Sequence, residues 1–332
     1  MKIKEKLYTI GLRLNLDKII LKMYGFPCDI KLKSINADKF AFYNRIAKDY
    51  PIVLKSFLLA QKDISSFISP FWAKEFETIK NELINNLKIN FLRNNILART
   101  ISVHSLPIIL SPEGKSYLEY IFNYDKEGIS NLMAEDGIGK PYIVYLKGCS
   151  SFVRIQHIYH LVKYRNETGN NVSDIRSIIE WGGGYGDFAA ILARLNNNVT
   201  YSIIDHPYMS ALQYVYIASV LKSTNRLNIV QFGDKPKIGH INFISLNNLN
   251  PDTTFNAEMF VSTFALTESS ESALKFVMDS NFFNAEKILI SYSSENKDVP
   301  FGTKYAAKIL EKYEMKKIPI STYRDFDYYL LK

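Results

Sequence analysis

A glycine-rich stretch carries the clearest chemistry in this chain of 332 residues. Ser177–Asp187 reads SIIEWGGGYGD, with the carboxylate of Glu180 just before the glycines. The β-branched residues before the glycines and the apolar residues at helical spacing after them predict a buried strand, a tight turn and a helix. Glycine permits positive φ and lets a ligand lie against the backbone. The N–H groups at the start of the helix would face that ligand, so we expect a cofactor site here.

The spacing of these residues separates two kinds of cofactor. A dinucleotide-binding turn requires G-x-G-x-x-G/A, and counting from Gly182 places Asp187 where the last small residue is needed. The alternating pattern Glu180-x-Gly182-x-Gly184-x-Gly186 instead resembles the S-adenosylmethionine motif of class I methyltransferases. A carboxylate beside the turn disfavours a pyrophosphate but suits a cationic sulfonium with an amino-acid tail.

Asp205 supports the same interpretation. It follows Gly186 by nineteen residues and ends the next predicted strand. An acidic side chain at that place can accept hydrogen bonds from both hydroxyls of a ribose. A glycine turn without any cofactor remains the alternative.

Longer segments extend the resemblance to one family. Ile179–Phe188 (IEWGGGYGDF), Ile203–Tyr214 (IIDHPYMSALQY) and Val261–Glu268 (VSTFALTE) are similar to the sugar O-methyltransferases of bacterial surface-polysaccharide clusters. The similarity covers about residues 175–295. One departure is His206, which stands where the family pattern has leucine before proline.

This resemblance implies S-adenosyl-L-methionine as the cofactor. The glycines would surround its methionine part, with Glu180 at the amino end and Asp205 at the ribose. Ser245 or Leu246, at the end of a later strand, would lie near the adenine. The residues implied for the cofactor are Glu180, Gly182, Gly183, Gly184, Tyr185, Gly186, Asp205, His206, Ser245, Leu246 and Ser262.

Methyl transfer to a sugar hydroxyl needs a group that removes the hydroxyl proton. Glu268 is the first candidate, because it comes just after the predicted strand 259–264, although it could equally cap a helix that begins near Ser269. His206 and His157 are the next candidates.

The other histidines have weaker claims. His160 lies three residues after His157 and could share its helix face, where both could also be ordinary interface residues. His104 and His240 stand alone. No HxH, HExxH or clustered carboxylate pattern is present, so no metal site is predicted.

The segment after the predicted strand 259–264 bears on the acceptor. Methyltransferases that act on bases or protein amines often carry Asn/Asp-Pro-Pro-Tyr/Phe there, whereas Ser262–Glu268 has no proline. We therefore expect an oxygen acceptor. The resemblance to the sugar O-methyltransferases implies that this acceptor is a sugar hydroxyl of a bacterial surface glycan or of its nucleotide- or lipid-linked precursor. An RNA or protein methyltransferase and a non-catalytic binding module of the same fold remain alternatives.

Strand and helix patterns alternate in the second half of the chain. Strands are predicted at 175–180, 199–204, 227–232, 241–245, 259–264, 287–292, 315–320 and 326–331, and helices near 151–165, 187–195, 208–221, 269–280 and 303–313. This alternation predicts an α/β, Rossmann-like sheet, mainly parallel and covered on both faces. Its ligand site would lie at the carboxyl ends of the strands.

The first half of the chain reads as mostly helical. Ile3, Leu7, Ile10 and Leu14 recur at helical spacing, and so do Phe76, Ile79, Leu83 and Leu87, as expected of helices packed on a core. We expect a helical cap and acceptor region at 1–145 and a cofactor-binding domain at 146–332, with the boundary between about 140 and 172.

Charge concentrates in the same half. The net charge is +8, and residues 1–100 hold 18 Lys and Arg against 9 Asp and Glu, whereas residues 181–332 hold 15 of each kind. A solvated helical surface is the ordinary interpretation, and a peripheral contact with anionic lipid is the functional one. No RNA-binding motif accompanies the charge, so no nucleic acid partner is expected.

Cellular location is predicted from absences. Cys28 and Cys149 lie far apart and outside any CxxC pattern, which predicts neither a disulfide framework nor a zinc site and fits a reducing cytoplasm. No signal peptide or membrane span is predicted. We therefore expect a cytoplasmic protein, with the inner face of the membrane as its second possible location.

Overall fold

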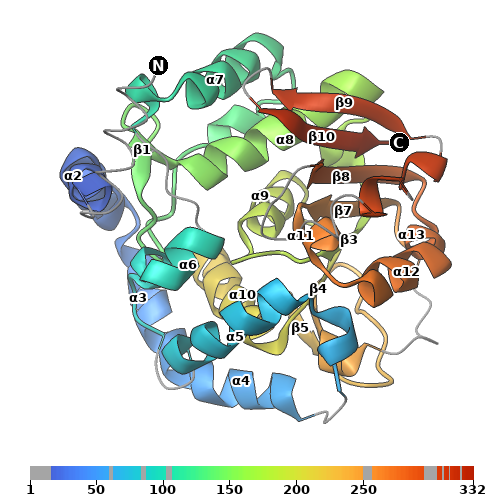
Figure 1. Cartoon of the computed structure of the whole chain (residues 1–332). Helices are drawn as coiled ribbons and strands as arrows, with labels where there is room; N and C mark the ends of the chain where they lie inside the picture. The colour runs from blue at the N-terminus through green and yellow to red at the C-terminus, as the bar shows by residue number, and fades with distance from the viewer. Residues whose placement is uncertain are drawn as a thin grey trace.

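The computed structural model of the chain describes residues 16–59, 63–83, 87–101, 107–249, 256–294, 305–308, 310–313, 315–321 and 324–332. The predicted helical stripe from Ile3 to Leu14 and the candidate His104 lie outside these residues. Figure 1 shows a central sheet with helices around it.

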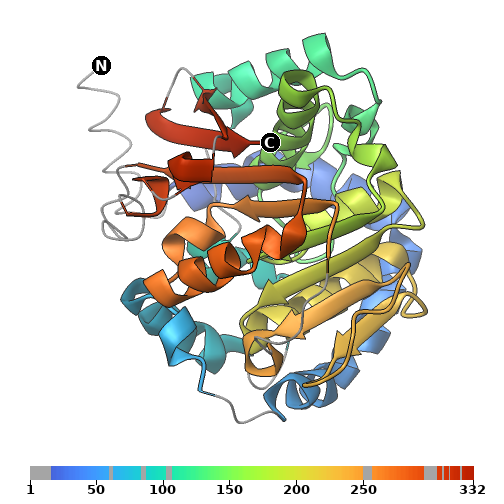
Figure 2. The ribbon, with the colours of Figure 1, turned by 90° about the vertical axis from the view of Figure 1, so that its right-hand side faces the viewer.

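Eight strands form this sheet, and their spatial order is β5-β6-β4-β3-β7-β8-β10-β9. All pairs are parallel except those of β10, which runs antiparallel to β8 and β9. In Figure 2 the sheet rises from β5 at the bottom to β9 at the top. In that order the bounds are Leu227–Val230, Ile241–Ser245, Thr200–Asp205, Ser177–Trp181, Met259–Thr263, Lys287–Ser293, Arg324–Leu331 and Lys316–Ser321.

Helices cover both faces of the sheet. One face packs against α8 (Phe152–Thr168), α9 (Asp187–Leu195) and α10 (Pro207–Leu221), and the other against α11 (Ala265–Glu268), α12 (Glu271–Asp279) and α13 (Asn281–Asn284). Successive side chains of a strand point to opposite faces. Ile178 of β3 accordingly joins the first hydrophobic core and Ile179 joins the second. The predicted α/β, Rossmann-like fold is confirmed.

Most predicted boundaries match within one or two residues. The helix predicted at 269–280 is an exception, because the backbone is extended at Ser269 and Ser270 and separates α11 from α12. The helix predicted near 303–313 falls partly outside the described residues, which include a 3-10 turn at Glu311–Tyr313.

The strands that follow β3 in the chain are added first on one side of it and later on the other. From β3 the chain crosses to β4 on one side, and it later returns to β7 on the other side. In an open parallel sheet, a ligand binds where the connections diverge in this way, beyond the carboxyl ends of the strands. Those ends belong to β3, β4 and β7.

The first half of the chain is helical, as predicted. Its helices are α2 (Leu16–Ile35), α3 (Ala37–Ile46), α4 (Tyr50–Leu58), α5 (Pro70–Leu83), α6 (Asn95–Thr100) and α7 (Pro112–Tyr124). α3 and α4 pack on α10, and α7 packs on α8. One hydrophobic core runs from Leu21 of α2 to Leu331 of β10, so the two predicted regions share it.

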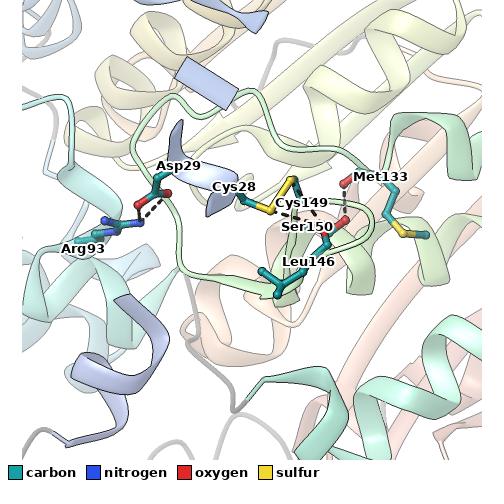
Figure 3. The surroundings of a disulfide bond; sticks show 7 residues. All are labelled: Cys28, Asp29, Arg93, Met133, Leu146, Cys149 and Ser150. Carbon is teal, nitrogen blue, oxygen red and sulfur yellow. Dashed lines mark hydrogen bonds and ion pairs between the residues drawn. A yellow bond between two sulfur atoms is a disulfide. The ribbon is translucent and has the colours of Figure 1, made fainter. Parts of the chain in front are cut away.

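The prediction for the two cysteines is wrong. Cys28 of α2 and Cys149 form a disulfide across 121 residues, with their Cα atoms 5.5 Å apart (Figure 3). Cys149 lies in the turn between β1 (Ile143–Tyr145) and β2 (Ser150–Ser151), and α2 packs on this hairpin. Separation in sequence gives no measure of distance in space, so spacing alone could not reveal the pair. Cysteine usage therefore no longer supports a reducing compartment.

Within the described ranges, no helix combines the length and the apolar character that crossing a bilayer requires.

Candidate functional site

A cavity of about 510 Å³ lies at the carboxyl ends of the strands. Gly182, Asp205 and Leu246 reach it from the ends of β3, β4 and β6. Trp72 of α5 and Ile101 after α6 form part of the opposite wall. Strand ends from the second half of the chain and helices from the first half thus enclose one space.

The glycine turn after β3 has the backbone that glycine allows. Gly182 has φ +75° and Gly184 has φ +55°, both in the left-handed region. A Cβ at Gly182 would collide with the Cβ of Ala265, whereas a Cβ at Gly184 would meet nothing within 4 Å. Gly182 is therefore required for packing against α11, and Gly184 borders open space in the cavity.

Glu180 does not line the cavity. Its side chain lies beneath Gly183, fully buried, and accepts a hydrogen bond of 2.9 Å from the hydroxyl of Tyr201. Burial raises the pKa of Glu180 to about 8, so the carboxyl is mostly protonated at neutral pH. Gly186 also lies outside the lining, because a Cβ added at this position would point toward Ile217 of α10.

Asp205 does line the cavity. Its Oδ1 accepts from the backbone N–H of His206 at 2.7 Å, and its Oδ2 accepts from Nε2 of Gln213 at 2.6 Å. The same Nε2 also donates to the carbonyl of Gly184 at 2.9 Å. Burial raises the pKa of Asp205 to about 7, above that of an ordinary aspartate. Gln213, for which the sequence pattern predicts no role, thus links the carboxylate to the glycine turn.

Gly183 and Tyr185, also implied for the cofactor, line the cavity. Three further residues of that set differ in position. Leu246 lines the cavity. Ser245 is buried and donates to the carbonyl of Phe57 at 3.4 Å. Ser262 donates to the carbonyl of Trp181 at 3.0 Å and accepts from Leu266 N–H at 2.9 Å. The hydroxyls of both serines are therefore engaged with backbone groups.

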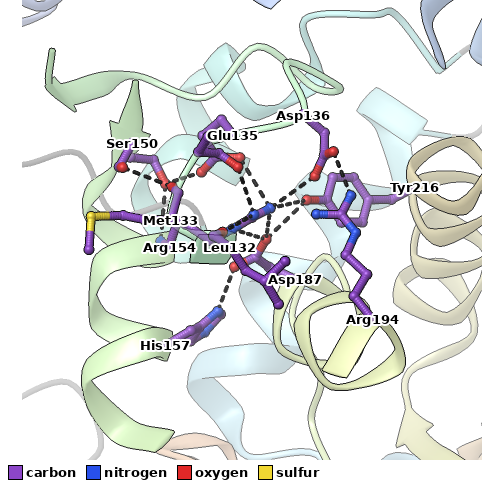
Figure 4. Close-up of polar contacts among 12 residues, drawn as sticks. Leu132, Met133, Glu135, Asp136, Ser150, Arg154, His157, Asp187, Arg194 and Tyr216 are labelled. Carbon is purple, nitrogen blue, oxygen red and sulfur yellow. Dashed lines mark hydrogen bonds and ion pairs between the residues drawn. The ribbon is translucent and has the colours of Figure 1, made fainter. Parts of the chain in front are cut away.

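His157 and Asp187 form a pair at the cavity wall. Nδ1 of His157 lies 2.8 Å from Oδ2 of Asp187, and the imidazole lines the cavity while the carboxylate is fully buried (Figure 4). Burial alone would raise the pKa of Asp187, but the guanidinium of Arg154 and the imidazole hold it well below its usual range. Asp187 is the residue that stands where a dinucleotide-binding turn needs glycine or alanine, and here its carboxylate positions His157.

Arg154 organises the charges behind this pair. Its guanidinium is fully buried and contacts Asp187 at 2.6 Å, Asp136 at 3.2 Å and Glu135 at 3.4 Å. It also donates to the carbonyls of Leu132 and Ala134 at 2.9 and 3.1 Å. Arg194 and Lys39 bind Asp136 from the other side, each at 2.5 Å. The network joins α8, α9 and the segment before β1. No motif in the sequence predicted it.

His206 occupies an apolar position. Its ring stacks on Phe76, with centroids 3.8 Å apart, and its Nδ1 accepts from the backbone N–H of Tyr208 at 3.4 Å as the cap of α10. Burial lowers the pKa of His206 to about 3. Its imidazole is therefore a weak proton acceptor at neutral pH.

Glu268 lines the cavity at the end of α11. Its Oε2 accepts from the indole N–H of Trp72 at 3.3 Å. It does not cap the next helix, because Ser270 does so through the N–H of Ala273. The suggested capping role for Glu268 is thus wrong, and its carboxylate belongs to the cavity.

Two further features shape the same wall. His160 is buried and hydrogen-bonds the hydroxyl of Tyr329, and burial lowers its pKa well below the usual value. Phe264, which lies between β7 and α11, has φ +72°, a strained conformation for a bulky residue. Backbone strain of this kind concentrates at functional sites. Among the described residues no cluster of histidine, cysteine and acidic side chains could hold a metal ion.

Comparison with known proteins gives limited similarity. No protein-family profile and no curated protein matches the chain. One similar solved structure is an O-methyltransferase family protein from Burkholderia thailandensis, at 16% identity and a TM-score of 0.34 over 54% of this chain and 59% of that one. Another is the N-methyltransferase NodS from Bradyrhizobium japonicum, determined with S-adenosyl-L-homocysteine, at 14% identity and a TM-score of 0.35 over 63% of this chain and 96% of that one. Since these values are low, we base no functional assignment on them.

Proposed function

We propose that this protein is an S-adenosylmethionine-dependent O-methyltransferase that acts on a sugar hydroxyl of a bacterial surface glycan or of its activated precursor. One observation carries the proposal: the glycine turn with Asp205 and the His157–Asp187 pair border the same cavity. A cofactor site and a proton acceptor at one space are what transfer of a group to an oxygen requires.

The residues at the glycine turn fit the cofactor. Gly184 leaves open space beside its backbone, where a ligand can lie close to the chain. Asp205 offers carboxylate oxygens to ribose hydroxyls, and Leu246 offers an apolar surface to a base. When bound, S-adenosylmethionine would supply a methyl group on a sulfonium, whose sulfur leaves readily as a neutral thioether. Glu180 lies beneath the turn and does not line the cavity, so its role in the proposal is to support the turn.

His157 is best placed to accept the proton of the acceptor hydroxyl. Ionised Asp187 accepts the N–H of Nδ1, so the second ring nitrogen is left as a proton acceptor. The buried carboxylate also stabilises the imidazolium that forms when the proton arrives. The low pKa of His206 argues against a role as the base, and its ring, stacked on Phe76, forms part of the aromatic wall of the site. Glu268 is the second candidate base and otherwise a hydrogen-bond acceptor for substrate hydroxyls.

The cavity wall favours a neutral, hydroxyl-rich acceptor. Glu268, Asp327 and Asp205 bring carboxyl groups to the lining, and Trp72 and Phe76 bring aromatic surface. Carboxylates accept hydrogen bonds from hydroxyls but repel phosphates in a poorly solvated space. An activated precursor would therefore keep its phosphates outside the cavity. The same repulsion disfavours RNA.

Two measurements test the proposal. Calorimetry should detect binding of S-adenosylmethionine to the wild type and a clear loss of affinity in Asp205→Ala. Equal binding by both, or none by either, would remove the cofactor assignment and favour a non-catalytic module. Labelled S-adenosylmethionine can then be offered to glycan, RNA and protein fractions. Label confined to RNA or protein would overturn the sugar acceptor.

A further inference from the structure

Helix α2 has two apolar faces, and the residues that the structure describes cover only one of them. Leu21, Cys28 and Leu32 are buried against the body of the protein, and the disulfide from Cys28 to Cys149 fixes that face. α2 lies at the left edge of the molecule in Figure 1, where it is seen nearly end on. Because the inner face is fixed in this way, the opposite face of α2 points away from the body of the protein.

Large apolar side chains occupy the outward face. Met23 is 74% exposed, Phe26 60%, Ile30 57% and Ile20 48%. Spacings of three and four residues put them in one stripe along a helix of 3.6 residues per turn. At about 100° per residue, this stripe lies nearly opposite the buried residues. We call these four residues the α2 stripe.

Lysines border the α2 stripe on both sides. On the same helical wheel Lys22 and Lys33 fall along one rim and Lys31 along the other, and all three are exposed. Two carboxylates near these lysines are already paired with other cations: Asp29 with Arg93 and Asp38 with Lys222. The rims thus keep their positive charge.

We propose that the α2 stripe lies on an anionic lipid surface, with its apolar residues among the acyl chains and its lysines at the headgroups. A helix with an apolar stripe between cationic rims is the form that binds in the plane of such an interface. Anionic headgroups complement the lysines, and each lysine near the surface strengthens binding about fivefold, the equivalent of about 1 kcal/mol.

Other occupants of the stripe are opposed by charge. In a symmetric pair the same patch faces itself, which would bring lysines against lysines. Residues 1–15 of the chain hold Lys2, Lys4, Lys6 and Arg13 against Glu5, so they also carry net positive charge. Anionic lipid complements the rims where these two do not. The proposal does not depend on the methyltransferase assignment.

The test is co-sedimentation of the full chain with vesicles of phosphatidylcholine, alone or mixed with phosphatidylglycerol. The wild type should bind the anionic vesicles and bind much less to the neutral ones. Replacing Met23, Phe26 and Ile30 by serine should weaken binding roughly tenfold or more, because each residue loses its apolar contact. Ile238→Ser is the matched control, because Ile238 is 89% exposed elsewhere and its loss should change nothing.

A second variant tests the rims without touching the apolar residues. Replacing Lys22, Lys31 and Lys33 by glutamine should reduce binding to anionic vesicles by about two orders of magnitude and leave binding to neutral vesicles unchanged. The proposal would be overturned if the wild type does not bind anionic vesicles, or if the serine variant binds them as well as the wild type does. If the wild type does not bind vesicles but forms a dimer, and the serine variant is a monomer, the stripe is a contact with a second copy of the chain. If the wild type does not bind vesicles and the serine variant unfolds at a lower temperature, another segment of the same chain packs on the stripe.

Discussion

Nδ1 of His157 lies 2.8 Å from Oδ2 of Asp187, and Oδ1 of the same carboxylate binds Arg154 at 2.6 Å. The carboxylate thus stands between a buried cation and an imidazole at the cavity wall. Because Arg154 keeps Asp187 ionised, the carboxylate fixes which ring nitrogen of His157 carries the proton. A charge pair deep in the protein thereby sets the chemistry at the surface of the cavity.

This relationship predicts the effect of removing the imidazole. His157→Ala should lower kcat by about 10²–10⁴-fold, the usual contribution of a positioned base, with little change in affinity for S-adenosylmethionine. Single-turnover kinetics and calorimetry measure the two quantities. Glu268→Gln is the matched control and should retain most activity. If Glu268→Gln is the inactive variant and His157→Ala the active one, the two roles must be exchanged.

Asp205 predicts how cofactor affinity depends on pH. Burial raises its pKa to about 7, and the ionised carboxylate is the form that accepts hydrogen bonds from ribose hydroxyls. Affinity should therefore be full above pH 7 and fall by up to tenfold per unit as the pH drops below 7. Calorimetry between acidic and neutral pH measures this slope. Asp205→Asn should remove it, and a wild type whose affinity is flat through this range would contradict the assignment.

Local patterns explain what the sequence could predict. The strand before Gly182, the helix after Gly186 and the acid at Asp205 each depend on a few neighbouring residues, and the structure has all three at the expected places. The direction of a side chain is also periodic. Glu180 shares a face of β3 with Ile178, which points between the sheet and its helices. That alternation could have indicated that Glu180 is buried away from the cavity.

Distant partners explain what the sequence could not predict. Arg154 meets Asp187 33 residues later and Asp136 18 residues earlier, and an arginine on an apolar helix has no pattern that marks it as buried. The pair of Cys28 and Cys149 depends in the same way on how α2 packs against the β1–β2 hairpin. Only tertiary packing brings such groups together.

The glycines of the turn give a paired prediction. A Cβ at Gly182 would collide with Ala265, so Gly182→Ala should destabilise the fold by several kcal/mol, in the range of overpacked and strained positions. A Cβ at Gly184 meets nothing, so Gly184→Ala should cost only about 1 kcal/mol, for its positive φ. Its main effect should be weaker cofactor binding, since the methyl group would enter the cavity. Urea denaturation and calorimetry separate the two outcomes, and equal stability of both variants would contradict the proposed packing.

The disulfide predicts a redox-dependent stability. Joining Cys28 to Cys149 closes a long loop, and linking residues so far apart stabilises a fold by about 2–5 kcal/mol. Cys28→Ser and Cys149→Ser should each lose this amount, and the double variant should lose no more than either one. Thermal unfolding with and without a dithiol reductant measures the effect. A wild type that is equally stable in both conditions, or single variants whose losses add, would show that the bond does not form in solution.

Arg154 predicts the largest loss of stability. Its charge is shared by Glu135, Asp136 and Asp187, all buried, and its removal takes the guanidinium away from Glu135 and Asp187, which neither Arg194 nor Lys39 binds. Breaking a buried pair from one side costs about 3–5 kcal/mol, so Arg154→Met should destabilise the fold by at least that amount. Arg194→Met is the control, because Arg194 is partly exposed and Lys39 also binds its partner Asp136; it should cost about 1 kcal/mol. Urea denaturation measures both. Equal losses in the two variants would mean that the guanidinium of Arg154 is not the centre of the network.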